Sequence, residues 1–269
     1  KHDWAGPRRP GIYKDADNPL TDQWMFHASS AVIKAHNLLR SFDEINKDQI
    51  GLSGISWGGV ITSTVIGFDQ RFAFAIPIYG SGYLADMENQ YHEALHNNVT
   101  YKKIWEPALR IAQFKNPTLW LTGLKESHFS LDAQASTYKL LNSHYQSIQP
   151  DLKHGHGAGW TPKEPYHFAR AIIQANPLPV FSNQSVEENR VSIEVEYIDK
   201  PSKAILYYTQ DRGHTFKRFW HQLPVNIKHD GNKLILSTAL PETASAWIFT
   251  IEKEGLNYSS EFSERKAAK

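Results

Sequence analysis

The chain has 269 residues, with 29 basic and 28 acidic side chains, a formal net charge of +1 at neutral pH, and no cysteine. This length suits one large domain or two ordinary ones, and the balanced charge gives no sign of a nucleic-acid-binding surface. The composition excludes disulfides and a cysteine nucleophile, and no apolar run approaches the roughly 18 residues that a membrane span needs.

The first 180 residues alternate helical and strand-like segments, which is the pattern of a parallel sheet with flanking helices. A helix is expected over 21–42, with Thr21 as its N-cap, and another over 161–174, with Thr161 as N-cap, Pro162 at the first position and Glu164 at the third. The other expected segments are strands at 49–54, 72–80, 117–123 and, more weakly, 147–153, and helices at 58–68 and 131–144.

After residue 180 the texture changes to short runs with two-residue periodicity or aromatic-rich character. Strands are expected at 191–198, 203–211, 217–228, 232–240 and 246–254, and the Asp230-Gly231 turn separates two of them. This spacing predicts a small antiparallel β-sandwich of the immunoglobulin-like type. We therefore expect an α/β domain at 1–180 and an accessory sandwich domain at 181–269.

A serine lies between the expected strand at 49–54 and the expected helix at 58–68, in Gly54-Ile55-Ser56-Trp57-Gly58. Gly-x-Ser-x-Gly on such a strand–turn–helix is typical of a serine nucleophile, because the flanking glycines let strand and helix approach. The Trp57 N–H, at the helix start, is a candidate oxyanion donor. The alternative is a glycine-rich turn whose serine has no chemical role.

A serine nucleophile needs a base and an orienting acid, which follow it in the order acid, then histidine, in α/β-hydrolases. Glu126, in the loop after the strand at 117–123, is the preferred acid. Asp132 is the second choice, because it also suits a cap for the helix that follows. His154 and His156 both lie in the loop after the last expected strand, and the residues alone leave the base open between them.

The region from Thr21 to Gln174 resembles an α/β-hydrolase of the prolyl-oligopeptidase/acetyl-xylan-esterase type. The resemblance is carried by WMFHASSAVIKAHNLLRS, GISWGG, RFAFAIPIYGSGYL, TLWLTGLKES and HGHGAGWTPKE. It favours His156 over His154, since the family's catalytic histidine leads the HGAG run, and it places Glu126 where the family has aspartate.

The resemblance also implies a substrate class and a setting. It implies a small-molecule or polysaccharide ester as substrate, such as an acetylated plant or algal polysaccharide, with no cofactor, in a secreted or periplasmic bacterial protein. A peptidase of the prolyl-oligopeptidase type is the alternative within the class. A non-catalytic binding protein on a hydrolase scaffold is the alternative outside it.

One expected feature of that family has no counterpart here. An α/β-hydrolase has several strands before the nucleophile strand, and the loop after the third supplies a second oxyanion donor. Only about one helix precedes that strand in this chain. The resemblance therefore predicts the C-terminal portion of a longer protein, with an N-terminal fragment completing the sheet, because an exposed sheet edge is usually avoided.

A competing metal pattern is His92-Glu93-Ala94-Leu95-His96, a formal His-Glu-x-x-His. Its polar flanks and its place between two sheet strands favour an exposed amphipathic cap helix, and a zinc hydrolase is the least favoured function. Zinc held by His154 and His156 has no carboxylate partner nearby in sequence, so no metal site is expected.

Four tryptophans could line a sugar-binding cleft, but packing in the core or in a lid is the favoured interpretation. They are Trp4, Trp24, Trp105 and Trp160.

Overall fold

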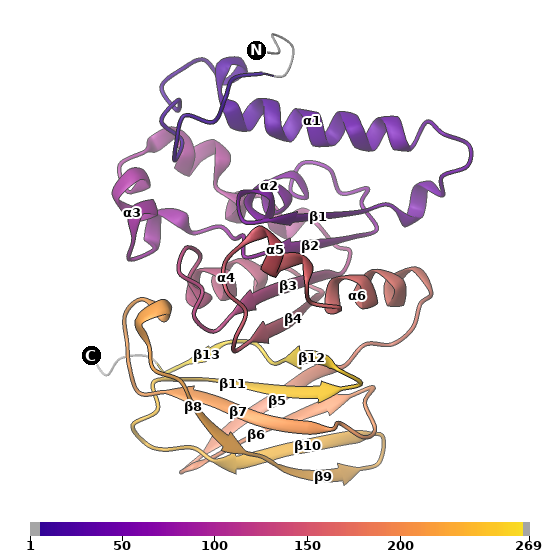
Figure 1. Cartoon of the computed structure of the whole chain (residues 1–269), viewed down its shortest axis with the longest axis vertical. Helices are drawn as coiled ribbons and strands as arrows, with labels where there is room; N and C mark the ends of the chain where they lie inside the picture. Colours follow the sequence, from indigo (N-terminus) through magenta and orange to yellow (C-terminus); the bar gives the residue numbers. More distant parts are fainter. Residues whose placement is uncertain (1–5, 266–269) are drawn as a thin grey trace.

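The computed structural model describes residues 6–265 and consists of an α/β part followed by a β-sandwich (Figure 1). The elements of the α/β part are α1 (Trp24–Leu39), β1 (Gly51–Ile55), α2 (Trp57–Val65), β2 (Phe74–Ile78), α3 (Gln90–Leu95), β3 (Thr118–Gly123), α4 (Leu131–Tyr138), β4 (His144–Gln149), α5 (His156–Trp160) and α6 (Glu164–Ile173). Within residues 6–265, no helix combines the length and the apolar character needed to cross a membrane.

Strands β1 to β4 are adjacent and parallel, in chain order. Every residue of β2 and β3 is buried, as expected for parallel strands covered on both faces. Alternate residues face opposite sides: Leu121 belongs to one core cluster and Trp120 to the other. Phe168 of α6 lies in the first cluster and Tyr138 of α4 in the second, so these helices cover opposite faces of the sheet.

The sandwich is not separate from this sheet, because β12 pairs with β4 through Ser259 and Gln146. One continuous sheet of nine described strands thus has the order β1-β2-β3-β4-β12-β11-β7-β8, with β13 also on β11, and a second sheet has the order β5-β6-β10-β9. The strands are β5 (Val180–Glu187), β6 (Arg190–Glu196), β7 (Lys203–Thr209), β8 (His221–Pro224), β9 (Asn226–Asp230), β10 (Lys233–Ala239), β11 (Ala246–Lys253), β12 (Leu256–Ser259) and β13 (Ser263–Glu264). The division of the chain into two domains at residue 180, where β5 begins, stays a prediction.

Several predicted boundaries are wrong. Thr21 lies in a short 3-10 turn, and Gln23 is the N-cap of α1. Thr161 ends α5, and Lys163 is the N-cap of α6. The α4 helix ends at Tyr138, which frees the chain to begin β4 at His144, three residues before the predicted start.

The turn between β1 and α2 depends on a close approach of backbones. A Cβ on Gly54 would lie 2.2 Å from the carbonyl oxygen of Gly58, and one on Gly59 would lie 2.8 Å from the Cα of Gly80. A Cβ on Gly58 would meet nothing within 4 Å. Of the two glycines in the Gly-x-Ser-x-Gly pattern, only Gly54 is therefore required by packing.

This asymmetry predicts opposite effects for two matched substitutions. Gly54→Ala should lower the free energy of unfolding by at least about 2 kcal/mol, because backbone must move to admit the methyl group. Gly58→Ala should leave it unchanged or raise it by up to about 1 kcal/mol, because alanine is the better helix former. Urea unfolding measures both, and equal losses in the two variants would contradict the packing assigned to Gly54.

A buried ionic contact fixes α1 against the loop after α2. His36 Nδ1 lies 2.9 Å from Asp69 Oδ2, and Arg71 Nη2 lies 2.7 Å from the same oxygen. Burial acts to raise the pKa of Asp69, but hydrogen bonds from Arg71 and His36 outweigh it and lower that pKa from 3.8 to about 2.

Because the pKa of Asp69 is depressed in the folded state, its ionised form stabilises the fold above pH 4 and loses that effect as the pH falls toward 2. The stability difference between the wild type and Asp69→Asn should therefore shrink by about 2 kcal/mol between pH 4 and pH 2. Urea unfolding of both proteins at a series of acidic pH values tests this, and a difference independent of pH would contradict it.

Candidate active site

Ser56 occupies the sharp turn between β1 and α2, at the carboxyl edge of the parallel strands. Its φ of 59° and ψ of −118° are rare for a residue with a side chain. The strained backbone is held by the Ser56 N–H, which donates to the Ile78 carbonyl at 2.9 Å, and by the Val60 N–H, which donates to the Ser56 carbonyl at 3.1 Å. The turn presents a half-buried hydroxyl above the sheet.

Trp57 is the first residue of α2, so its N–H has no acceptor within the helix. It adjoins Ser56 at the positive end of the helix, where a developing negative charge is favoured.

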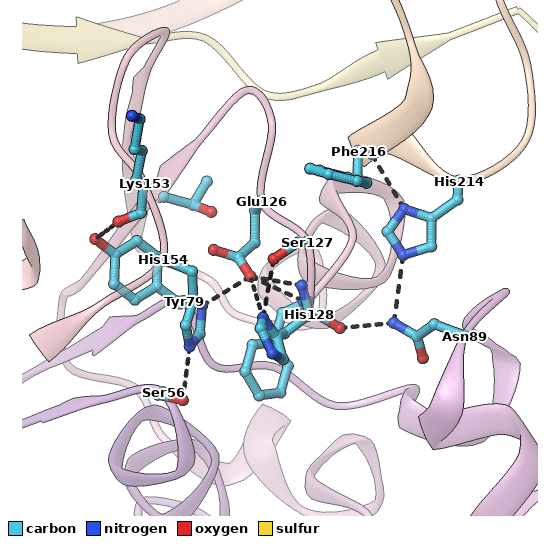
Figure 2. Close-up of polar contacts among 12 residues, drawn as sticks. Ser56, Tyr79, Asn89, Glu126, Ser127, His128, Lys153, His154, His214 and Phe216 are labelled. Carbon is cyan, nitrogen blue, oxygen red and sulfur yellow. Dashed lines mark hydrogen bonds and ion pairs between the residues drawn. The ribbon is translucent and has the colours of Figure 1, made fainter.

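His154, in the loop after β4, contacts both Ser56 and Glu126 (Figure 2). Its Nε2 lies 2.9 Å from Ser56 Oγ, and its Nδ1 lies 2.8 Å from Glu126 Oε1. An ionised carboxylate can only accept a hydrogen bond, so Nδ1 carries the ring proton. Nε2 is then free to accept the proton of the Ser56 hydroxyl.

The structure places His154, and not the preferred His156, beside Ser56. His156 is exposed and is the first residue of α5. The second-choice acid, Asp132, is also not at this position: it is an exposed residue in the first turn of α4. Glu126, the preferred acid, is the carboxylate that His154 contacts.

Tyr79 holds the loop that carries His154. The Tyr79 hydroxyl donates to the Lys153 carbonyl at 2.9 Å, and its ring centroid lies 4.9 Å from that of His154. Burial raises the pKa of Tyr79, and the charge of Glu126 adds to the effect, so the phenol remains a donor. A Cβ on Gly123 would lie 2.1 Å from the Leu152 carbonyl oxygen, which requires glycine where this loop crosses the end of β3.

Glu126 is fully buried, and its two carboxylate oxygens have unequal surroundings. Oε1 accepts hydrogen bonds from the N–H groups of His128 at 2.7 Å and Phe129 at 3.3 Å, in addition to His154. Oε2 is buried without a partner among the described residues. The two backbone donors fix the carboxylate in the direction of the histidine.

His128 is a neighbour of the site that the sequence analysis missed. Its ring centroid lies 4.2 Å from that of His154, and its Nδ1 lies 3.7 Å from Glu126 Oε1. Burial, reinforced by His154, lowers the pKa of His128, although Glu126 opposes this. Only its position two residues after Glu126 could have pointed to it.

The β-sandwich contributes to the loop that carries Glu126. Thr215, on the connection between β7 and β8, accepts a hydrogen bond at its Oγ1 from the Leu131 N–H at 3.1 Å. Asn89 Nδ2 donates to the His128 carbonyl at 2.9 Å and lies 3.3 Å from Nε2 of His214, on the same connection (Figure 2). The acid loop is thus bordered on one side by the sandwich.

The His-Glu-x-x-His segment forms α3 and its C-cap, and each of its two histidines contacts a backbone carbonyl through Nδ1. His92 Nδ1 contacts the Ala85 carbonyl at 2.7 Å, and His96 Nδ1 contacts the His92 carbonyl at 2.8 Å. Among residues 6–265, the one group of three His, Asp or Glu side chains close enough to share a metal ion is Glu126, His128 and His154. Within that described range, His92 and His96 have no further His, Asp or Glu close enough to complete a metal site with them, and His154 is not grouped with His156.

The tryptophans considered for a sugar cleft have different surroundings. Trp105 is buried and donates from Nε1 to Gln23 Oε1. Trp24 packs edge-on against Trp57, with ring centroids 5.6 Å apart. Trp160 is 54% exposed, and Trp4 lies outside the described residues.

Comparison of the sequence with protein-family profiles and with curated proteins gives no significant match. Among solved structures, the chain is similar to acetyl xylan esterase 1 from Thermoanaerobacterium sp. JW/SL YS485 (18% identity, TM-score 0.50, 62% of this chain and 59% of that one). It is also similar to an acetyl xylan esterase from Paenibacillus sp. R4 (17% identity, TM-score 0.51, 63% of this chain and 59% of that one). A further similar structure is dipeptidyl peptidase 4 from Porphyromonas gingivalis (15% identity, TM-score 0.47, 56% of this chain and 23% of that one).

The chain has the α/β-hydrolase fold, as its parallel sheet, flanking helices and similarity to the two esterase structures show. It spans less than two thirds of the length of either esterase chain.

The contact from the sandwich predicts that Thr215 affects the reactivity of Ser56. Thr215→Val keeps the shape of the side chain but leaves the Leu131 N–H unpaired, so the Glu126 loop should loosen. Labelling of Ser56 by a fluorophosphonate should slow by about tenfold, equivalent to about 1.4 kcal/mol.

Thr215→Ser should keep the labelling rate of the wild type. Thr243 is an exposed threonine in the same part of the chain, and Thr243→Val should leave the labelling rate unchanged. An unaltered rate in Thr215→Val would show that the sandwich does not position the site.

Proposed function

We propose that this protein is a serine hydrolase that cleaves acyl esters, with Ser56 as nucleophile, His154 as base and Glu126 as the orienting acid. One observation carries the proposal: the contacts from Ser56 Oγ through His154 to Glu126, at 2.9 and 2.8 Å. The three side chains come from the turn after β1 and the loops after β3 and β4, in the chain order serine, acid, histidine.

In the first half of the reaction, Ser56 Oγ attacks the acyl carbonyl carbon while its proton moves to His154 Nε2. The imidazolium that forms is stabilised by Glu126, which keeps accepting from Nδ1–H. The carbonyl oxygen gains negative charge next to the Trp57 N–H at the start of α2. The bond to the leaving alcohol then breaks, and His154 Nε2 returns the proton to that alcohol.

In the second half, a water molecule takes the place of the alcohol. It gives a proton to His154 Nε2 and attacks the acyl group on Ser56. The bond to Ser56 Oγ breaks, the proton returns to Oγ, and the carboxylic acid leaves. The Trp57 N–H is one oxyanion donor in both halves.

For the substrate, we propose an acetyl ester on a carbohydrate. The two esterase structures that share the fold are described as acetyl xylan esterases, which supports this choice. A peptidase would have to hold the N-terminal side of a peptide, and no described contact is assigned to that task. A panel of acetylated oligosaccharides and aminoacyl amides separates the two activities.

The assignment predicts different outcomes for neighbouring histidines. In p-nitrophenyl acetate hydrolysis by the full-length protein, Ser56→Ala and His154→Ala should each lower kcat by at least about a thousandfold, because each removes a group that moves the proton. His156→Ala should retain activity within about threefold. A chelator should not lower the activity of the wild type.

Loss of activity in His156→Ala alone would overturn the assignment of the base. Activity that survives Ser56→Ala and disappears with chelator would favour the His92/Glu93/His96 zinc alternative. No activity in correctly folded full-length protein would favour a binding protein on a hydrolase scaffold.

A further inference from the structure

Two loops at the catalytic edge bring a carboxylate and two imidazoles together. Glu126 and His128 belong to the loop after β3, and His154 belongs to the loop after β4. One potential ligand atom from each lies within 4.8 Å of the other two. The proposed triad uses Glu126 and His154 and leaves out the imidazole of His128, whose Nδ1 lies 3.0 Å from Ser127 Oγ (Figure 2).

The spacing of these atoms suits a small divalent cation. Zinc binds nitrogen and oxygen ligands at about 2.0–2.2 Å, so neighbouring ligands of a tetrahedral site lie about 3.3 Å apart. Glu126 Oε1 lies 2.8 Å from His154 Nδ1 and 3.7 Å from His128 Nδ1. Both values lie within about half an ångström of what zinc requires.

The donor set and its exposure also favour zinc. Two imidazoles with one carboxylate suit zinc better than magnesium or calcium, which prefer oxygen ligands. Among the described residues Glu126 Oε2 is buried without a partner, so the hydrogen bonds to Oε1 leave the acceptor capacity of this second oxygen unused. The His128 side chain is 43% exposed, which gives an ion a route in from solvent. Water then fills the coordination position of the ion that faces solvent.

We propose that Glu126, His128 and His154 form a zinc site that switches off the proposed catalytic centre. Zinc binds the Nδ1 lone pair of His154, so the proton of the neutral ring must sit on Nε2. One proton leaves Nδ1 and one arrives at Nε2, and the ring stays neutral. His154 Nε2 then donates toward Ser56 Oγ and can no longer accept the hydroxyl proton, which is the wrong tautomer for a general base.

Binding of zinc is a property of these three side chains alone, whereas the inhibition rests on the proposed function. Two separate measurements therefore test the site. Zinc binding is measured by calorimetry on Ser56→Ala, which retains all three ligands. Inhibition is measured as the zinc concentration that halves p-nitrophenyl acetate hydrolysis, with EDTA added afterwards to test reversal.

In both measurements, His128→Asn should weaken the effect of zinc by at least about tenfold, since even the loss of an outer partner of a metal ligand commonly costs that much. Each variant is compared with its own zinc-free activity. The paired change His92→Asn with His96→Asn removes the other close histidine pair and should leave the zinc response unchanged, and magnesium should neither bind nor inhibit at the same concentrations.

An equal zinc response in His128→Asn and the wild type would overturn the site, as would loss of the response in the His92/His96 variant. Zinc binding that depends on His128 in a protein without esterase activity would keep the site and reject the proposed function. Esterase activity that zinc does not affect would keep the function and reject the switch.

Discussion

The site depends on one constraint, which is the close approach of the backbones of β1, α2 and the end of β2. This approach restricts the conformation of the turn between β1 and α2. Glycines at 54, 59 and 80 permit the approach, and Ser56 adopts a positive φ, at a cost of about 1–3 kcal/mol that its hydrogen bond to Ile78 helps to offset. Once that turn fixes Ser56 at the carboxyl edge of the sheet, the other groups need only come from loops at the same edge. Glu126 after β3 and His154 after β4 meet this condition, because neighbouring parallel strands end side by side.

The parts of the site that the sequence predicts are those set by local pattern. Ser56 stands out because a strand, a glycine-flanked serine and a helix follow one another directly, and Glu126 because it is the first acidic residue after a buried strand. The choice between His154 and His156 could not be made locally, since both lie in the same glycine-rich run. In the structure, a hydrogen bond from Tyr79 to Lys153 joins residues 74 positions apart next to His154, the histidine that lies 2.9 Å from Ser56 Oγ. A helix that begins at His156 turns that residue outward.

The fold was predictable to a similar degree. The apolar run of β2 and the apolar centre of β3 indicate buried strands, so an α/β arrangement was predictable from the pattern, while the hydrolase type came from the resemblance. The junction with the sandwich was not, because it depends on Ser259 of the four-residue β12 reaching Gln146 of β4. Such a short strand has no period to detect. Cap assignments at Thr21 and Thr161 failed for a related reason: both threonines suit a helix start, but a short 3-10 turn and α5 already occupy those positions.

The continuous sheet brings the sandwich into contact with the loops that carry the site residues. Because β12 lies against β4, the sandwich sits next to the strand that leads to His154, and its β7–β8 connection reaches the loop that carries Glu126. A glutamate is one methylene longer than an aspartate, so a carboxylate in this role needs more support to keep its direction. Two backbone N–H groups and the Thr215 contact supply that support at Oε1 and in the adjoining helix, while Oε2 remains buried and unpaired, at a cost of about 1–3 kcal/mol. The proposed zinc site would use the same carboxylate: Glu126 Oε1 lies 2.8 Å from His154 Nδ1 and 3.7 Å from His128 Nδ1, so the contacts that orient the acid also set the spacing of the candidate ligands.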